Sequence, residues 1–217
     1  NWPDAAAPGP RPTSALFAND GLGRFTDVTA QSGLDLSLYG MGVAVGDYDN
    51  DGRSDLYVTA VGHNRLMRNT ANGFVDVSQS ARVMGDANAW STSAAFFDYD
   101  RDGDLDLFVC QYVKWSAQIN ADVNYSLTGV GRAYGPPTDY AGTQNTLYRN
   151  DGGRFTDVTA EAGIVVTNQA TGGPVGKSLA LLPDDINNDG WVDVVVANDT
   201  VRNFLFLNQQ DGTFVEV

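Results

Sequence analysis

Carboxylate and amide side chains recur at a fixed spacing in three short segments of this chain. The segments run from Asp47 to Asp55, from Asp98 to Asp106 and from Asp185 to Asp193, and are named here the first, second and third loop. Each has Asp or Asn at positions 1, 3 and 5, glycine at position 6 and Asp at position 9. Oxygen atoms so spaced converge only if the backbone turns sharply, which glycine permits. Because clustered carboxylates repel one another, the pattern predicts sites for a hard divalent cation, namely calcium.

The candidate metal ligands stand at positions 1, 3, 5, 7 and 9 of each loop. They are Asp47, Asp49, Asp51, Arg53 and Asp55; Asp98, Asp100, Asp102, Asp104 and Asp106; and Asp185, Asn187, Asp189, Trp191 and Asp193. The sequence therefore predicts up to three Ca²⁺ ions and no other cofactor.

The loops admit two other interpretations. An EF-hand begins in the same way but needs a bidentate Glu at position 12 and a helix on each side. Position 12 is instead Val58, Val109 or Val196, within β-branched and aromatic runs that favour strands. The loops are thus expected to join strand to strand. An ordinary Asp-rich turn is the other alternative, and three copies in register argue against it.

A second motif repeats between the loops. A Leu-x-x-Asn segment leads through a glycine-containing turn to a short run beginning with Phe, which is typical of a β-hairpin. Copies occupy residues 16–29, 66–78, 147–159 and 205–217. Two strands around a loop and two in a hairpin make a unit of about 50 residues, the size of a propeller blade. A solenoid of the same unit is the structural alternative.

The predicted fold is therefore all-β, a β-propeller of four-stranded blades. One hairpin and three full units give about three and a half blades in residues 15–217, preceded by a Pro-rich linker at 1–14. A ring cannot close on half a blade, so we expect part of a longer, seven-bladed protein. Two copies forming one ring are the alternative.

These motifs carry a family resemblance. The loops resemble FG-GAP or VCBS repeats, and Gly176–Leu179, Asp189–Asp199 and the stretch 203–214 are similar to the ASPIC/UnbV group, related to cartilage acidic protein. The resemblance implies a seven-bladed propeller followed by a further C-terminal domain, with this chain as its N-terminal portion. Two departures, Asn187 in place of Asp and Pro183 in the preceding strand, predict that the third loop binds calcium most weakly and that Pro183 interrupts that strand.

Charge and composition limit the partners. The formal net charge is -14, with only two lysines and no basic cluster, which disfavours nucleic acid and anionic membrane as partners. No apolar run is long enough to cross a bilayer. Calcium sites of the extracellular class bind at about 0.1–1 mM and fill only outside a cytosol. We therefore expect an extracellular, cell-surface or periplasmic location.

Residues suited to catalysis are scarce. His63 is the single histidine, the Gly-x-Ser-x-Gly pattern is absent, and the paired carboxylates are already explained as metal ligands. Cys110, the only cysteine, lies in a predicted strand and is expected to be buried and inert. The chain is predicted not to be an enzyme. Part of a secreted polysaccharide-active enzyme is the alternative.

A long insertion at 111–145 is the candidate contact surface. Its aromatic residues suit protein or glycan contacts, and long loops on rigid scaffolds commonly carry function. A flap covering a blade is the alternative. The sequence as a whole favours a calcium-binding protein- or glycan-binding or scaffold module, within a surface or membrane-associated assembly.

Overall fold

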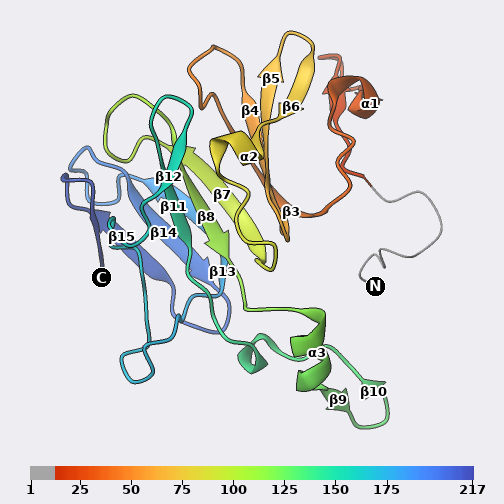
Figure 1. Cartoon of the computed structure of the whole chain (residues 1–217), viewed down its shortest axis with the longest axis vertical. Helices are drawn as coiled ribbons and strands as arrows, with labels where there is room; N and C mark the ends of the chain where they lie inside the picture. The colour runs from red at the N-terminus through yellow and green to blue at the C-terminus, as the bar shows by residue number, and fades with distance from the viewer. Residues whose placement is uncertain (1–12) are drawn as a thin grey trace.

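A computed structural model describes residues 13–217 of the chain, so most of the predicted linker at 1–14 lies outside the described residues. The described strands form three four-stranded and two two-stranded antiparallel sheets (Figure 1). The first sheet holds β3 (Tyr39–Gly46), β4 (Asp55–Val61), β5 (Arg65–Thr70) and β6 (Gly73–Asp76). The second holds β7 (Ser91–Phe97), β8 (Asp106–Gln111), β11 (Thr146–Asn150) and β12 (Phe155–Asp157). The third holds β13 (Ser178–Asp184), β14 (Asp193–Asn198), β15 (Phe204–Asn208) and β16 (Phe214–Glu216).

Smaller elements flank these sheets. The hairpin of β1 (Phe17–Asn19) and β2 (Phe25–Asp27) precedes the first sheet. One-turn helices α1 (Thr29–Ser32) and α2 (Ser78–Ala81) follow β2 and β6. The insertion carries α3 (Ala117–Val123), β9 (Ser126–Leu127), β10 (Gly131–Arg132) and the 3₁₀ turn η1 (Pro137–Asp139). These helices carry no strong hydrophobic period and were not predicted from the sequence.

Strand pairing agrees with the predicted unit. Each acidic loop joins the first two strands of a sheet, and each Leu-x-x-Asn motif begins the hairpin of the last two. The prediction that Pro183 interrupts its strand is wrong. Pro183 pairs with Val194 inside β13, which among the described strands has only β14 as a partner. An edge strand tolerates proline because it needs no N–H on its open side.

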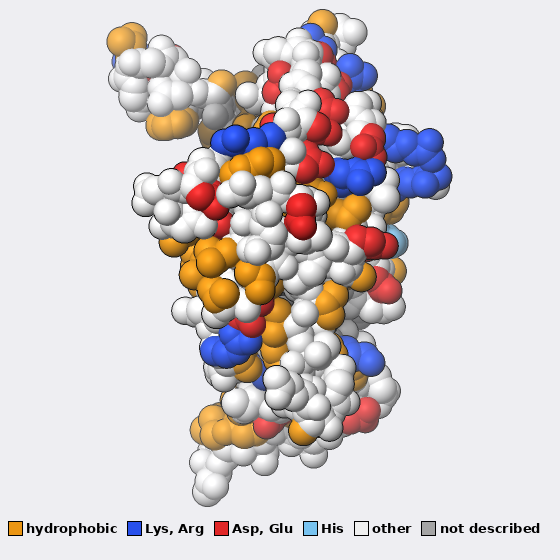
Figure 2. Space-filling view, turned by 90° about the vertical axis from the view of Figure 1, so that its left-hand side faces the viewer, with side chains coloured by type: hydrophobic (Ala, Val, Ile, Leu, Met, Phe, Trp, Pro, Cys, Tyr) orange, Lys and Arg blue, Asp and Glu red, His pale blue; other side chains and the backbone are white. Residues whose placement is uncertain are grey.

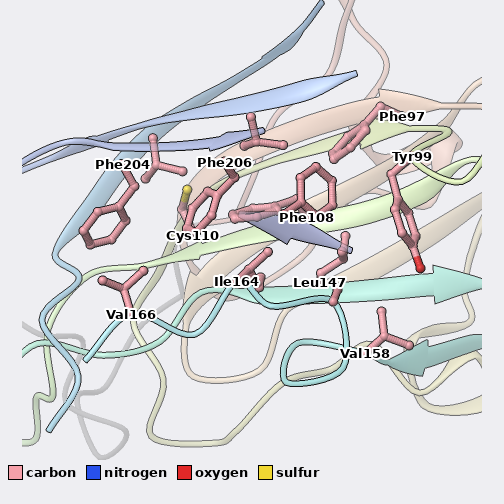
Figure 3. Packing of buried hydrophobic residues seen from close by; sticks show 14 residues of the cluster. Phe97, Tyr99, Phe108, Cys110, Leu147, Val158, Ile164, Val166, Phe204 and Phe206 are labelled. Carbon is pink, nitrogen blue, oxygen red and sulfur yellow. The ribbon is translucent and has the colours of Figure 1, made fainter. Parts of the chain in front are cut away.

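The core lies between the sheets, and β7 packs between β3 and β13. Alternate residues of β8 serve two clusters, with Leu107 and Val109 facing the first sheet and Phe108 and Cys110 facing the third (Figure 3). All four are fully buried. This two-sided burial explains why the strand is apolar at every position. Cys110 is buried as predicted, and burial raises the pKa of its thiol to about 12.

The outer sheets differ from the middle one. Val43 and Val45 on β3 are 59% and 61% exposed, and Leu179 and Leu182 on β13 are 46% and 56% exposed. Both ends of the row of sheets therefore present apolar side chains to solvent. The described residues show no closed ring of sheets.

Candidate metal centres

All three loops are closed by the same backbone turn. The position-1 carboxylate accepts hydrogen bonds from the backbone N–H groups of positions 5 and 6 at 2.8–3.2 Å. Position 4 has φ of 55–62° and the glycine at position 6 has φ of 86–94°. Added Cβ atoms at Gly52 and Gly103 would meet nothing within 4 Å. Glycine is needed there for its left-handed backbone and not for space, as the sequence predicted.

Positions 1, 3 and 9 meet in the first two loops. In each triad, Asp47, Asp49 and Asp55 or Asp98, Asp100 and Asp106, the carboxylate oxygens lie within 4.8 Å of one another. Sequence analysis predicted these six residues as ligands, and the fold brings them together. A group of three carboxylates at this separation could hold a metal ion.

The position-9 carboxylate also performs a structural task that sequence analysis missed. One oxygen of Asp106 accepts the N–H of Tyr99 at position 2 and the other accepts the N–H of Asn150 at the end of β11. Asp55 and Asp193 make the same pair of bonds. All three are fully buried. Position 9 therefore ties each loop to the hairpin of its own sheet, and the recurring Asn of the hairpin motif was the available signal.

The environment of the second loop disfavours the charged form of its carboxylates. Burial raises the pKa of Asp106 to about 7, and hydrogen bonds only partly oppose the effect. Burial and the charge of Asp102 raise the pKa of Asp100, and burial raises the pKa of Asp55 in the first loop. Among the described residues, no positive charge is ion-paired to the second cluster, and the first is only partly compensated; a divalent cation would supply the missing charge.

Unsatisfied oxygens point to the same requirement. Oδ1 of Asp49 and Oδ1 of Asp100, both at position 3, are buried and have no hydrogen-bond partner among the described residues. A buried carboxylate oxygen without a partner is costly, and hard cations bind such oxygens directly. The donor set of the first two loops therefore fits a calcium ion.

An arginine partly neutralises the first loop. Nε of Arg68 lies 2.6 Å from Oδ2 of Asp49, and its Nη2 lies 3.3 Å from Oδ2 of Asp51. The corresponding Arg149 of the second sheet pairs with Asp151 of its own hairpin turn instead. Among residues 13–217, no arginine is therefore ion-paired to the triad of the second loop, which carries the stronger unbalanced charge.

The third loop differs. Asn187 at position 3 donates from Nδ2 to Asp189 at 3.0 Å and accepts the N–H of Asp189 at 2.9 Å, and Gln210 donates to Asp189 as well. The side chains at positions 3 and 5 therefore satisfy each other's hydrogen bonds. Of positions 1, 3 and 9, only positions 1 and 9 carry a carboxylate in this loop. Occupation of this loop by calcium stays a prediction.

Side chains at position 7 turn away from the triads. Arg53 pairs with Asp51, Asp104 accepts from Asn50 Nδ2 at 2.8 Å, and the Trp191 ring lies 4.7 Å from the Arg101 guanidinium. In a calcium loop this position binds through its backbone carbonyl, and that role stays a prediction, as does the role of Asp51, Asp102 and Asp189 at position 5. Figure 2 shows acidic side chains gathered toward the top of one face, beside Lys and Arg side chains.

The loops are also linked to one another. Position 4 of one loop donates to the position-6 carbonyl of the next, from Asn50 to Gly103 and from Arg101 to Gly190. Behind them, Asn150 Nδ2 donates to the Tyr48 carbonyl at 2.8 Å, joining the second sheet to the first loop. Asn208 and Tyr99 repeat that bond between the third sheet and the second loop.

Comparison with known proteins supports the repeat. A family model described as an FG-GAP-like repeat matches residues 1–58, 48–109 and 185–217, which include all three loops. A solved chain of an Agrocybe aegerita lectin, described as recognising non-reducing terminal N-acetylglucosamine, matches with a TM-score of 0.46 and 16% identity. The match covers 94% of this chain but only 46% of the lectin chain, and so distant a likeness carries no argument. No curated protein matches the sequence.

Proposed function

Because this chain belongs to the family of FG-GAP-like repeats, we propose that it is a calcium-stabilised propeller segment that acts outside the cytosol as a protein- or glycan-binding or scaffold module. The observation that carries the calcium part is the pair of carboxylate triads, each with a buried position-3 oxygen that lacks a partner. Asp47, Asp49 and Asp55 would hold one ion. Asp98, Asp100 and Asp106 would hold a second.

The cation would act on the fold and not on a substrate. It would offset the repulsion between buried carboxylates and satisfy the unpartnered oxygens of Asp49 and Asp100. Because the position-9 residue of each triad also holds the hairpin, calcium would stabilise the loop and the outer strands together. The loops also contact one another, so two bound ions would stiffen a shared edge of the sheets.

Calorimetry with calcium and with chelator tests this proposal. For a site of about 0.1 mM affinity in ~1 mM calcium, linkage gives about 1.4 kcal/mol, so two sites contribute about 3 kcal/mol. At this chain length that is a rise of roughly 6–12 °C in melting temperature. Magnesium should substitute poorly because it demands stricter geometry.

A double variant, Asp49→Asn with Asp100→Asn, should abolish the calcium-dependent rise while relieving repulsion in its absence. Asp189→Asn in the third loop is the matched control and should retain most of the rise. Identical melting curves with calcium and with chelator would show that the loops are ordinary turns.

The cellular role is the less constrained part of the proposal. We place the chain in a seven-bladed propeller of the ASPIC/UnbV type, at a cell surface, in a periplasm or outside the cell, without catalytic activity of its own. Among residues 13–217, no helix has the length and apolar character needed to span a membrane. A glycan array and a polysaccharide hydrolase panel on the full-length protein would separate the binding module from the enzyme alternative. Turnover of any polysaccharide would contradict the proposal of a non-catalytic binding module.

A further inference from the structure

A pocket lined by aromatic rings lies where the insertion meets the first strands of two sheets. Its cavity is about 280 Å³, and its walls include six aromatic side chains: Tyr39, Trp90, Tyr112, Trp115, Tyr134 and Tyr140. Small-molecule sites usually run from about 300 to 1,000 Å³, so the space suits a small ligand. We refer to it as the aromatic pocket. It is separate from the acidic loops.

The rings stand at steep angles to one another. Trp90 is edge-to-face with Tyr112 at 76° and with Trp115 at 90°, with ring centroids 5.3 and 6.0 Å apart. Perpendicular walls do not form one flat platform. They can surround a compact group from several sides, as in aromatic cages that bind quaternary ammonium ions.

Several polar groups of the wall are already engaged within the protein. The Tyr112 hydroxyl donates to Asp199 Oδ2 at 2.6 Å, and the Tyr140 hydroxyl donates to Asn120 Oδ1 at 2.8 Å. A sugar ring presents many hydroxyl groups, and each that is buried without a partner costs binding energy. A quaternary ammonium ion makes no conventional hydrogen bond and needs none from these walls.

Charges around the pocket also bear on the choice. Among the residues that the structure describes, no charged side chain lines it. The Asp199 carboxylate accepts the hydrogen bond of the Tyr112 hydroxyl. The Lys177 ammonium donates to the carbonyl of Pro137, another wall residue, at 2.7 Å. Burial and the bond to Asp199 raise the pKa of Tyr112, so its ring stays a neutral phenol polarised by a carboxylate. A polarised ring attracts a cation more strongly, and the net charge of -14 favours cations in general.

We propose that the aromatic pocket binds a small quaternary ammonium group, such as the trimethylammonium of choline. Cation–π attraction to Trp90, Tyr112 and Trp115 would supply the selectivity. Asp199 would strengthen binding through Tyr112, and Lys177 would weaken it by like-charge repulsion. This inference is independent of calcium binding and survives if the loops bind no metal.

Titration calorimetry of the whole chain with choline, against 3,3-dimethylbutan-1-ol as its uncharged isostere, tests the proposal. We expect choline to bind at least about tenfold more tightly, since cation–π contacts are absent in the isostere. Equal binding of the two, or no binding of choline, would overturn it. Binding of neutral monosaccharides in preference to choline would overturn it in favour of a glycan site.

Two substitutions give an electrostatic signature that mere burial of an apolar ligand would not produce. Asp199→Asn should weaken choline binding severalfold, and Lys177→Met should tighten it. Tyr112→Phe keeps the ring but removes the bond to Asp199, so it should also weaken choline binding. It replaces Asp199→Asn in the test if that variant misfolds. Phe25→Leu, in the first hairpin and 64% exposed, is the control and should leave binding unchanged. Opposite or absent effects of both charge changes would contradict the proposal.

A second experiment distinguishes a lipid head group from a free ion as the source of the ammonium group. Vesicles of phosphatidylcholine should compete with free choline if the pocket reaches a lipid head group, and should not if it binds the free ion. Either result supports the ammonium site, and capture of phosphatidylglycerol vesicles to the same extent would overturn it.

Discussion

At the scale of single residues, the asparagine that ends the third strand of the second and third sheets joins its own sheet to the loop of the preceding unit. Asn150 is fully buried and donates to the carbonyls of Leu105 in the second loop and Tyr48 in the first loop. Spacing in the sequence predicted which Asp residues converge, because each triad is local. It could not predict a bond spanning 102 residues, since that bond depends on how the sheets are placed.

Replacing Asn150 with alanine should therefore destabilise the protein. The change leaves two carbonyls without their donor, at a cost of about 2–3 kcal/mol. Asn69→Ala is the matched control: Asn69 is only half-buried and donates to Ser54 of its own sheet, so we expect about 1 kcal/mol. Denaturant unfolding measures both. Equal losses would show that the bond between sheets adds nothing.

Arg68 should compete with calcium at the first loop, because it pairs with Asp49 and Asp51. Arg68→Leu copies Leu207, which stands at this place in the third sheet. It should lower the melting temperature in chelator and enlarge the rise with calcium, because the site becomes severalfold tighter once the competing charge is removed. Arg149→Leu, whose partner Asp151 lies outside the second loop, is the control and should change the calcium response less.

At the scale of elements, the insertion stands apart from the sheets that carry it. Its strands β9 and β10 form a separate hairpin that extends with α3 beyond the sheets (Figure 1). Neither core cluster contains a described residue of 111–145. The aromatic content predicted a contact surface and the structure adds a pocket, but α3 escaped prediction because its seven residues show no strong pattern and are capped only by Ser116.

Shortening the insertion should therefore leave the sheets folded. We expect a chain with residues 114–141 replaced by a short glycine-serine turn to keep its far-UV circular dichroism and to lose only a few degrees of melting temperature. Retaining Val113 and Gly142 preserves their bridge at the base. Collapse of the fold would instead identify the insertion as a flap over the blades.

At the scale of the whole molecule, the three sheets and the first hairpin were predictable because each is written as its own repeat. The sequence predicted that the ends of the row of sheets are open, but not which side chains are exposed there, since exposure depends on which neighbouring sheet is present. Val43 and Val45 at one end and Leu179 and Leu182 at the other resemble buried positions in sequence, yet they are exposed. Such apolar strand faces favour association.

The isolated chain should accordingly self-associate as its concentration rises. Sedimentation velocity should detect larger species, and the double variant Val43→Lys with Val45→Lys should reduce them by placing two charges on that face. Val130→Lys, in the hairpin of the insertion and 74% exposed, is the control. A monomer at every concentration would contradict the interpretation of the exposed apolar end faces as surfaces that pack against another sheet.

The bonds that join neighbouring sheets also bear on how such a protein can change over generations. The buried asparagine bond of each junction takes its acceptor from the earlier unit and its donor from the later one, as Tyr48 with Asn150 and Tyr99 with Asn208. Duplication or loss of one complete unit in the gene would place an equivalent donor beside an equivalent acceptor and restore the same junction. Gain or loss of part of a unit would leave a buried carbonyl or amide unmatched. Selection should therefore accept changes of length in steps of whole units, while unrelated insertions collect away from these asparagine bonds, as in the segment between β8 and β11.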